Sequence, residues 1–244
     1  MADCDGVSEA SLKEIGMPIA QRLEEKAYCN TDKLFKNWWR LLQNFDINKA
    51  AAEKTFTEIV AAYSTPNRFY HTLKHIDRIL EVIQQLEYQT QDLQTVQLAA
   101  WFHDIVYHTK AKDNEEKSAA RAVELLLPLS IPSNAIKNVK RLILTTKTHQ
   151  ALTSDSDAQI LLDADLAILG SNASEYSKYT QAIRQEYFWV PEIEYFVARK
   201  QVLENFLQRK NIYFTQEIQQ TKEKTARNNL EAEIEQISSK IKGK

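Results

Sequence analysis

The chain has 244 residues, and its 31 Lys and Arg nearly balance its 33 Asp and Glu. This balance excludes proteins that recruit nucleic acid through a bulk positive charge. The four glycines are dispersed, so the sequence holds no phosphate-binding loop, dinucleotide fingerprint or nucleophile elbow, because each of these motifs needs clustered glycines.

Neither a disulfide scaffold nor a membrane anchor is indicated. Cys4 and Cys29 are too few and wrongly spaced for a disulfide framework or a cysteine zinc site. The acidic start of the chain differs from the basic start of a signal peptide, and no apolar run approaches the ~18 residues of a membrane span. We therefore expect a cytoplasmic protein with neither a membrane nor a nucleic acid as its partner.

Helical periodicity dominates the first half of the chain. Residues 1–30 are polar and are expected to form an N-terminal extension. From Leu34 onward, apolar residues recur every three or four positions, which predicts amphipathic helices. Another helix is expected to begin between Pro66 and Thr72, because proline favours the first helical turn. The helices predicted in this half cover residues 34–45, 50–63, 93–104 and 115–127, and the helix that begins between residues 66 and 72 extends to residue 86.

The second half continues the pattern up to a charged tail. Pro128 and Pro191 end two helices, and Gly170 stands where a left-handed C-terminal cap is expected. The predicted helices cover residues 133–149, 158–169, 174–190 and 192–210. We therefore predict an all-α fold, with one helical domain over residues 31–214 and a charged C-terminal helix over residues 215–244 that packs on the domain or extends from it.

Two pairs of polar residues stand out in this pattern. His71 and His75 are four residues apart, so they share one face of a helix. His103 and Asp104 follow an apolar run, where a buried carboxylate is costly unless a cation or several donors compensate it. Both members of this second pair can reach one ion if their backbone lies at a helix end. A single histidine is more often structural, but the combination favours a site.

A later apolar segment carries two more carboxylates. Asp163 and Asp165 are two residues apart, so they project from different faces of a helix. One of them is expected to coordinate an ion and the other to cap or orient. A set of two imidazoles and two carboxylates suits Mn²⁺, Fe²⁺, Co²⁺, Ni²⁺ or Mg²⁺ with open positions for water, rather than a closed structural zinc site. The candidate ligands are His75, His103, Asp104 and Asp165.

A first His, an adjacent His-Asp pair and a distant Asp, all on helices, resemble the HD superfamily of metal-dependent phosphohydrolases, and within it a branch of predicted HD hydrolases. The matching stretches are residues 67–76, 101–104, 113–119 and 161–166, and the likeness extends over about residues 38–231. It implies that His75 is the first ligand, that His103 and Asp104 are the central pair, and that Asp165, or Asp163 two residues earlier, is the last.

Four further residues are candidates for proton transfer or ligand binding. Asp113 and Glu115 either begin a helix, where acidic residues are favoured, or act as general base or proton shuttle. The HD resemblance adds weight to the second reading. Either an acidic residue or His71 is expected to transfer the proton. His149 either stabilises the C-terminal end of a helix or binds substrate or a second metal ion. His108, in the loop after the pair, is expected to play no part.

Arg68 and Arg199 are the candidates for binding phosphate. Arg199 falls on or beside the apolar face of its predicted helix, so a partly buried guanidinium there should have an anionic partner. That partner is either the substrate phosphate, bound through two parallel hydrogen bonds, or an internal carboxylate such as Glu186 or Asp163. Arg68 lies close to His71 in the sequence and is a candidate for the same reason.

The leading hypothesis is a metal-dependent phosphohydrolase that uses a metal-activated water on a small phosphomonoester, nucleotide or phosphodiester. The alternative is a non-catalytic regulatory module with an HD fold that binds a metal ion and a nucleotide. A third reading makes the histidines structural, with no bound metal. The sequence does not select the substrate, the metal or the number of ions, and it is compatible with a homo-oligomer.

Overall fold

The computed structural model describes residues 19–45 and 47–242, with side chains from Thr31 onward, and every regular element in these ranges is a helix. The predicted all-α fold is confirmed. None of the helices in these ranges combines the length and apolar character that crossing a membrane requires. The chain divides into two compact units, residues 1–56 and 57–244. The domain limits expected at residues 30 and 214 stay a prediction, and residues 1–18 of the expected extension lie outside the described residues.

The first unit contains two helices joined by a short turn. Helix α2 spans Ile19–Leu42, the 3₁₀ turn η1 spans Gln43–Phe45, and α3, which continues into the second unit, spans Lys49–Tyr63. The indole N–H of Trp38 donates a hydrogen bond to the Ala52 carbonyl at 3.0 Å. The Phe35 and Phe56 rings meet edge to face. These contacts follow from the apolar spacing that predicted both helices.

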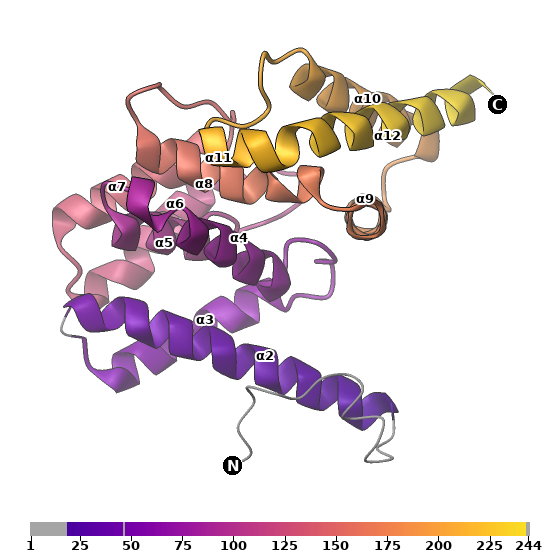
Figure 1. Cartoon of the computed structure of the whole chain (residues 1–244). Helices are drawn as coiled ribbons and strands as arrows, with labels where there is room; N and C mark the ends of the chain where they lie inside the picture. The colour runs from indigo at the N-terminus through magenta and orange to yellow at the C-terminus, as the bar shows by residue number, and fades with distance from the viewer. Residues whose placement is uncertain (1–18, 46, 243–244) are drawn as a thin grey trace. The chain divides into compact units, whose positions relative to one another are not determined.

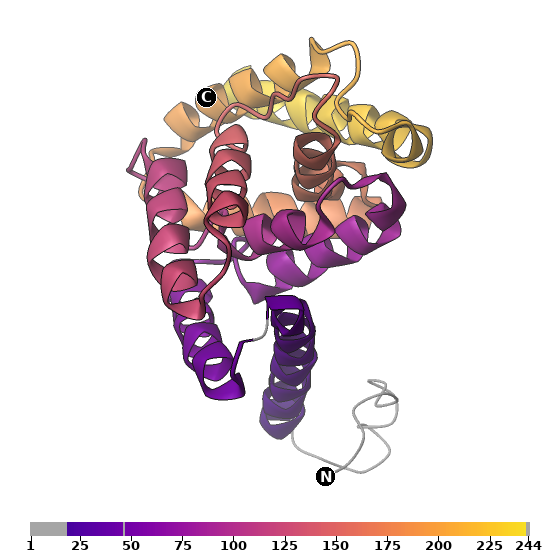
Figure 2. The same ribbon diagram turned by 90° about the vertical axis from the view of Figure 1, so that its left-hand side faces the viewer.

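The second unit is a larger set of helices around α5. Helix α5 buries seven of its ten residues and contacts α4, α6, α7 and α8, so it lies in the core. Figures 1 and 2 show α12 running beside α10. The elements are α4 (Leu73–Gln85), η2 (Glu87–Gln89), α5 (Leu93–Phe102), α6 (Asn114–Leu126), η3 (Leu127–Leu129), α7 (Ser133–Thr145), α8 (Ser156–Leu166), η4 (Ala167–Gly170), α9 (Ala173–Glu186), α10 (Glu192–Leu207), α11 (Gln216–Ile218), the π-helical turn η5 (Gln219–Glu223) and α12 (Lys224–Lys242).

Helix ends differ from the prediction where distant parts of the chain compete for the backbone. The helix expected to begin between Pro66 and Thr72 begins at Leu73. The N–H groups of residues 69–71 point instead at the Glu186 carboxylate. Helix α7 ends at Thr145 rather than at His149, and His149 adopts a left-handed φ of 49°.

The expected left-handed cap at Gly170 is wrong, because this glycine does not adopt that conformation. Its missing side chain serves a close approach instead. A Cβ atom at this position would lie 2.6 Å from the Lys222 Cβ and 2.9 Å from the Lys222 carbonyl oxygen. Glycine therefore lets the π-helical turn η5 pack directly on η4.

Candidate metal centre

Three helices bring two imidazoles and a carboxylate together in the second unit. His75 lies in the first turn of α4, His103 directly follows α5, and Asp165 lies in the last turn of α8. The Nε2 atoms of His75 and His103 are 3.3 Å apart. The Oδ1 atom of Asp165 is 3.2 Å from the first and 3.7 Å from the second. One ligand atom from each residue thus lies within 4.8 Å of the others, so this group could hold a metal ion.

Local sequence explains why these side chains point inward. His75 belongs to the buried face of α4 together with Ile76 and Ile79. Helix α5 ends at Phe102, so His103 and Asp104 lie directly after a helix end. This position lets two adjacent side chains reach one ion. His75 and His103 are 3% and 2% exposed, so the group is shielded from bulk water.

The orientation of His103 is fixed by its second nitrogen. The Nδ1 atom lies 2.9 Å from the Ala100 carbonyl oxygen, and a carbonyl only accepts, so Nδ1 donates this bond. In the neutral ring, Nε2 then presents its lone pair to His75 and Asp165. A ligand histidine in proteins is typically held in this way, through its other N–H.

Asp104, the fourth predicted ligand, borders the same group. Its Oδ2 atom is 3.1 Å from the His103 Nε2 and 3.9 Å from the His75 Nε2. Burial alone would raise the pKa of Asp104, but the charges of His103 and His71 hold the pKa well below its usual range. Burial likewise opposes ionisation of Asp165, yet hydrogen bonds from His103, His149 and His75 lower its pKa. Both carboxylates are therefore ionised and attract a cation.

The two cluster histidines differ in their protonation. Burial lowers the pKa of His75, and this effect outweighs the hydrogen bond with Asp165. For His103, burial also disfavours the charge, but the Asp104 and Asp165 carboxylates outweigh it and raise the pKa. A proton on the Nε2 atom of either ring would occupy the place of a metal ion, so metal binding competes with protonation of these imidazoles.

Glu186, at the end of α9, was not predicted as a site residue, yet it organises the segment before α4. Its Oε1 atom accepts hydrogen bonds from the backbone N–H groups of Phe69, Tyr70 and His71 at 2.8, 2.8 and 3.0 Å. Its Oε2 atom accepts from the His71 Nδ1 at 2.6 Å and from the Tyr107 hydroxyl at 3.2 Å. One feature of the sequence indicates that this carboxylate is buried: Glu186 continues the apolar face of α9 three residues after Ile183.

His149 approaches the cluster from the loop after α7. Its Nε2 atom lies 3.1 Å from the Oδ2 atom of Asp165 and donates to it, because an ionised carboxylate only accepts. Arg209 fixes the loop by donating to the His149 carbonyl at 2.9 Å. His149 is compatible with both roles considered for it: its side chain contacts Asp165, and its backbone N–H donates to the Thr145 carbonyl at the end of α7 at 3.0 Å.

Asp163 and Asp165 do face in different directions, as their spacing predicts. Asp163 is fully buried and accepts hydrogen bonds from the Phe214 N–H, the Thr215 N–H and the Thr215 hydroxyl. Burial raises its pKa to about 6, against the effect of these bonds. Asp163 therefore anchors the segment before α11, and Asp165 is the member of the pair that lies at the cluster. Asp163 thus takes the orienting role that was expected of one member of the pair, through backbone and hydroxyl donors rather than a cation.

Both arginine candidates have internal partners. Arg68 donates to the carbonyls of Asp104 at 2.6 Å and Ile105 at 2.9 Å, so it holds the backbone beside the cluster. Arg199 forms a two-bond ion pair with Glu233 of α12, at 2.8 and 3.1 Å. The partner is an internal carboxylate, as one of the two alternatives expected, but it is Glu233 rather than Glu186 or Asp163, because the sequence did not show that α12 packs against α10.

The remaining candidates divide between the cluster and the surface. Glu115 lines the cavity next to the cluster. Asp113 does not line it, and its exposed carboxylate pairs with Lys117 at 2.9 Å, a position that supports the helix-start reading. His108 accepts from the Lys110 N–H in the loop and also does not line the cavity.

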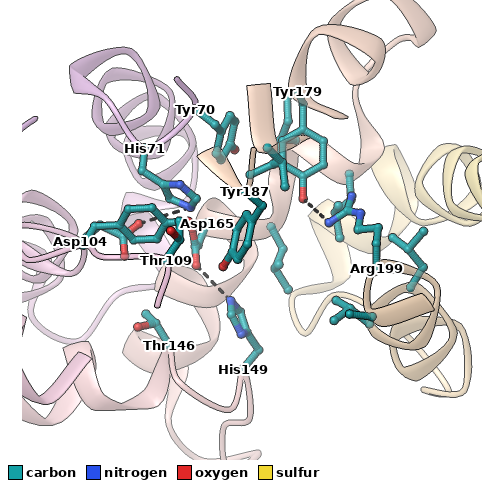
Figure 3. Close-up of a pocket in the computed structure, with 18 of the residues that line it drawn as sticks. Tyr70, His71, Asp104, Thr109, Thr146, His149, Asp165, Tyr179, Tyr187 and Arg199 are labelled. Atoms are coloured by element: carbon teal, nitrogen blue, oxygen red, sulfur yellow. Dashed lines mark hydrogen bonds and ion pairs between the residues drawn. The ribbon is translucent and has the colours of Figure 1, made fainter. Parts of the chain in front are cut away.

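A cavity of about 480 Å³ opens beside the cluster. Figure 3 shows His71, Asp104, His149 and Asp165 at one end, with Tyr187 in the middle and Arg199 beyond it. His103 also lines this end, whereas His75 lies behind it. A ligand in the cavity would therefore reach the candidate metal centre directly.

Comparison of the chain with protein-family models, with curated proteins and with solved structures gave no match. The resemblance to HD phosphohydrolases therefore rests on the residues of this chain alone, and it is developed below as a proposal.

Proposed function

We propose that this protein is a metal-dependent phosphohydrolase of the HD type. The observation that carries the proposal is the group formed by His75, His103 and Asp165 at one end of a cavity, with the Asp104 carboxylate beside it. Two imidazole nitrogens and carboxylate oxygens match the donor preferences of Mn²⁺, Fe²⁺, Co²⁺ and Ni²⁺. A divalent cation supplies what phosphoester hydrolysis needs, a more acidic water and neutralisation of phosphate charge.

His71 is the best-placed residue for handling a proton. Glu186 binds its Nδ1 atom, and the Tyr107 ring stacks on the imidazole with ring centroids 4.1 Å apart. These contacts leave Nε2, which lies 3.8 Å from the Asp104 Oδ2, on the cavity side. Burial by itself lowers the pKa of His71, but the charges of Asp104 and Glu186 outweigh burial and raise it. In its protonated form, His71 would present the Nε2 proton on the cavity side, where the leaving oxygen of the ester can take it.

Two residues around the cluster orient Asp104 and Asp165. His149 donates to the Oδ2 atom of Asp165, so the Oδ1 atom remains directed at His75 and His103. Arg68 binds the Asp104 carbonyl, so the backbone of this carboxylate is fixed. Partners of this kind typically change metal affinity or activity by about 10- to 100-fold when they are removed.

The test compares two esters whose alcohols differ in leaving ability. Metal-depleted protein is assayed on phenyl phosphate and p-nitrophenyl phosphate after addition of Mn²⁺, Fe²⁺, Co²⁺, Ni²⁺ or Mg²⁺. We expect turnover only with added metal. For His71→Asn we expect a loss of about 10²- to 10⁴-fold in kcat on phenyl phosphate. The loss should be smaller on p-nitrophenyl phosphate, because p-nitrophenolate leaves without a proton.

The matched control is His108→Asn, which changes a histidine outside the cavity and should leave both rates unchanged. Metal binding without turnover of any phosphoester would contradict the proposal and favour a regulatory module. Equal losses on the two esters would remove the proton-donating role of His71 and leave the hydrolase proposal standing.

A further inference from the structure

The cavity is much larger than a phosphate needs, and its two ends differ in chemistry. Its volume of about 480 Å³ falls in the range of pockets for whole small molecules. Much of the rest of the wall is formed by α9, α10 and the segment between them. Apolar and aromatic side chains dominate there, among them Tyr179, Ile183, Tyr187, Trp189, Leu203 and Phe206.

The charges in the cavity are poorly suited to a polyphosphate. Asp104, Asp165 and Glu115 contribute carboxylates, and among the described lining residues Arg199 is the sole Lys or Arg. Its guanidinium already forms two hydrogen bonds with Glu233 and donates to the Tyr179 hydroxyl at 3.2 Å. Within the cavity, a second or third phosphate would therefore meet carboxylates with no lysine or unengaged arginine in the lining to neutralise it. Lys110, 4.8 Å from the centre of the Trp189 ring, lies outside the lining.

The apolar end also continues to the surface. Trp189 and Val202 line the cavity and are 41% and 45% exposed, so they lie at its mouth. The Trp189 ring is held in place, because its indole N–H donates to the Thr109 hydroxyl at 2.8 Å. A fixed aromatic wall of this kind favours a planar ring, which can pack against it face to edge or offset-stacked.

We propose that the substrate is a phosphoester with a single phosphate group and an aromatic alcohol, an inference that rests on the proposed function. The phosphate lies against the cluster formed by His75, His103 and Asp165. The ring of the alcohol occupies the space between α9 and α10, next to Tyr179 and Phe206. Polyphosphates and esters of small polar alcohols are poor substrates.

The first experiment compares three substrates with the metal that gives the highest activity. These are 1-naphthyl phosphate, glycerol 2-phosphate, which lacks a ring, and ATP, which carries a ring but three phosphates. We expect KM for 1-naphthyl phosphate to lie at least about 10-fold below the KM of the other two, because contacts with the ring strengthen substrate binding whereas leaving ability changes kcat. Calorimetry with metal-free protein should show saturable binding of 1-naphthol, which lacks a phosphate.

Two substitutions on α10 separate the cavity from the surface. Ala198 is exposed and lines the cavity, so Ala198→Phe places a ring in the space assigned to the alcohol. Val197 is exposed and does not line the cavity, so Val197→Phe is the matched control. We expect Ala198→Phe to weaken 1-naphthol binding by at least about 10-fold, and Val197→Phe to leave it unchanged. Val202→Asp, which puts a charge at the mouth, should also weaken it.

The outcomes distinguish this inference from the proposed function. If glycerol 2-phosphate or ATP is hydrolysed with a KM as low as that of 1-naphthyl phosphate, the aromatic substrate class is overturned and the hydrolase stands. If no ester is hydrolysed but Ala198→Phe abolishes 1-naphthol binding, the aromatic site stands and the hydrolase fails. Absence of 1-naphthol binding, or equal effects of Ala198→Phe and Val197→Phe, overturns the inference.

Discussion

Replacing His103 with Ala is expected to weaken divalent-metal binding by at least about 100-fold. Loss of a residue that only hydrogen-bonds to a metal ligand already lowers metal affinity by about 10- to 100-fold. Metal-stimulated hydrolysis should be lost with it. The Nε2 atom of His103 lies within 3.7 Å of ligand atoms from His75, Asp104 and Asp165, so the substitution removes the member that contacts all the others. Calorimetric titration of metal-free protein with Mn²⁺ measures the change.

The control for this substitution is His108→Ala, five residues along the chain and outside the cavity. It should bind Mn²⁺ like the wild-type protein. Circular dichroism should show that both variants keep their helical content, because His103 lies beyond the end of α5. Unchanged Mn²⁺ affinity in His103→Ala would remove His103 from the site.

Glu186→Gln is expected to lower the free energy of unfolding at pH 7 by about 3 kcal/mol, the equivalent of a pKa difference of roughly 2.5 units. Burial alone would raise the pKa of Glu186, but hydrogen bonds from His71 and from the backbone outweigh burial and lower the pKa to about 2. The amide cannot carry the charge that these donors stabilise. Urea denaturation of the wild-type protein and the variant measures the difference.

On the acid side, the pH dependence of this difference has a fixed sign. A carboxylate with a lowered pKa stabilises the folded state above its unfolded pKa, which is near 4.3 for Glu, and loses that contribution as pH falls towards its folded pKa. The difference between wild type and Glu186→Gln should thus shrink from about pH 5 towards pH 2, and it should also decrease at high pH, where His71 loses the charge that lowers the pKa of Glu186. Glu194→Gln, at an exposed position of α10, should change stability by less than about 0.5 kcal/mol. A difference that widens as pH falls below about 5 would contradict the assignment.

Much of the fold and the centre of the site follow from local patterns. Amphipathic spacing predicted the helices because each buries one apolar face, and the structure has helices in all these stretches. His75, His103 and Asp165 were identifiable because each interrupts an apolar surface, where an uncompensated polar group is costly. The same reasoning could not tell which of Asp163 and Asp165 lies at the cluster, because backbone donors from a distant segment can satisfy a carboxylate as a cation can.

Features that depend on contacts between distant segments could not be predicted. Glu186 binds the backbone 115 to 117 residues earlier, and this contact delays the start of α4. Arg199 pairs with Glu233 because α12 packs along α10, whereas the sequence of the tail shows only alternating charge. Nothing in the local sequence around His149 indicates the left-handed backbone that directs it to Asp165.

Anomalous X-ray diffraction from crystals grown with Mn²⁺ tests the metal assignment most directly. We predict one strong peak bonded to the Nε2 atoms of both His75 and His103 and to an Asp165 oxygen, with Asp104 at or next to the coordination sphere. A fully loaded crystal whose manganese lies elsewhere, with these three side chains still in direct contact, would contradict the account.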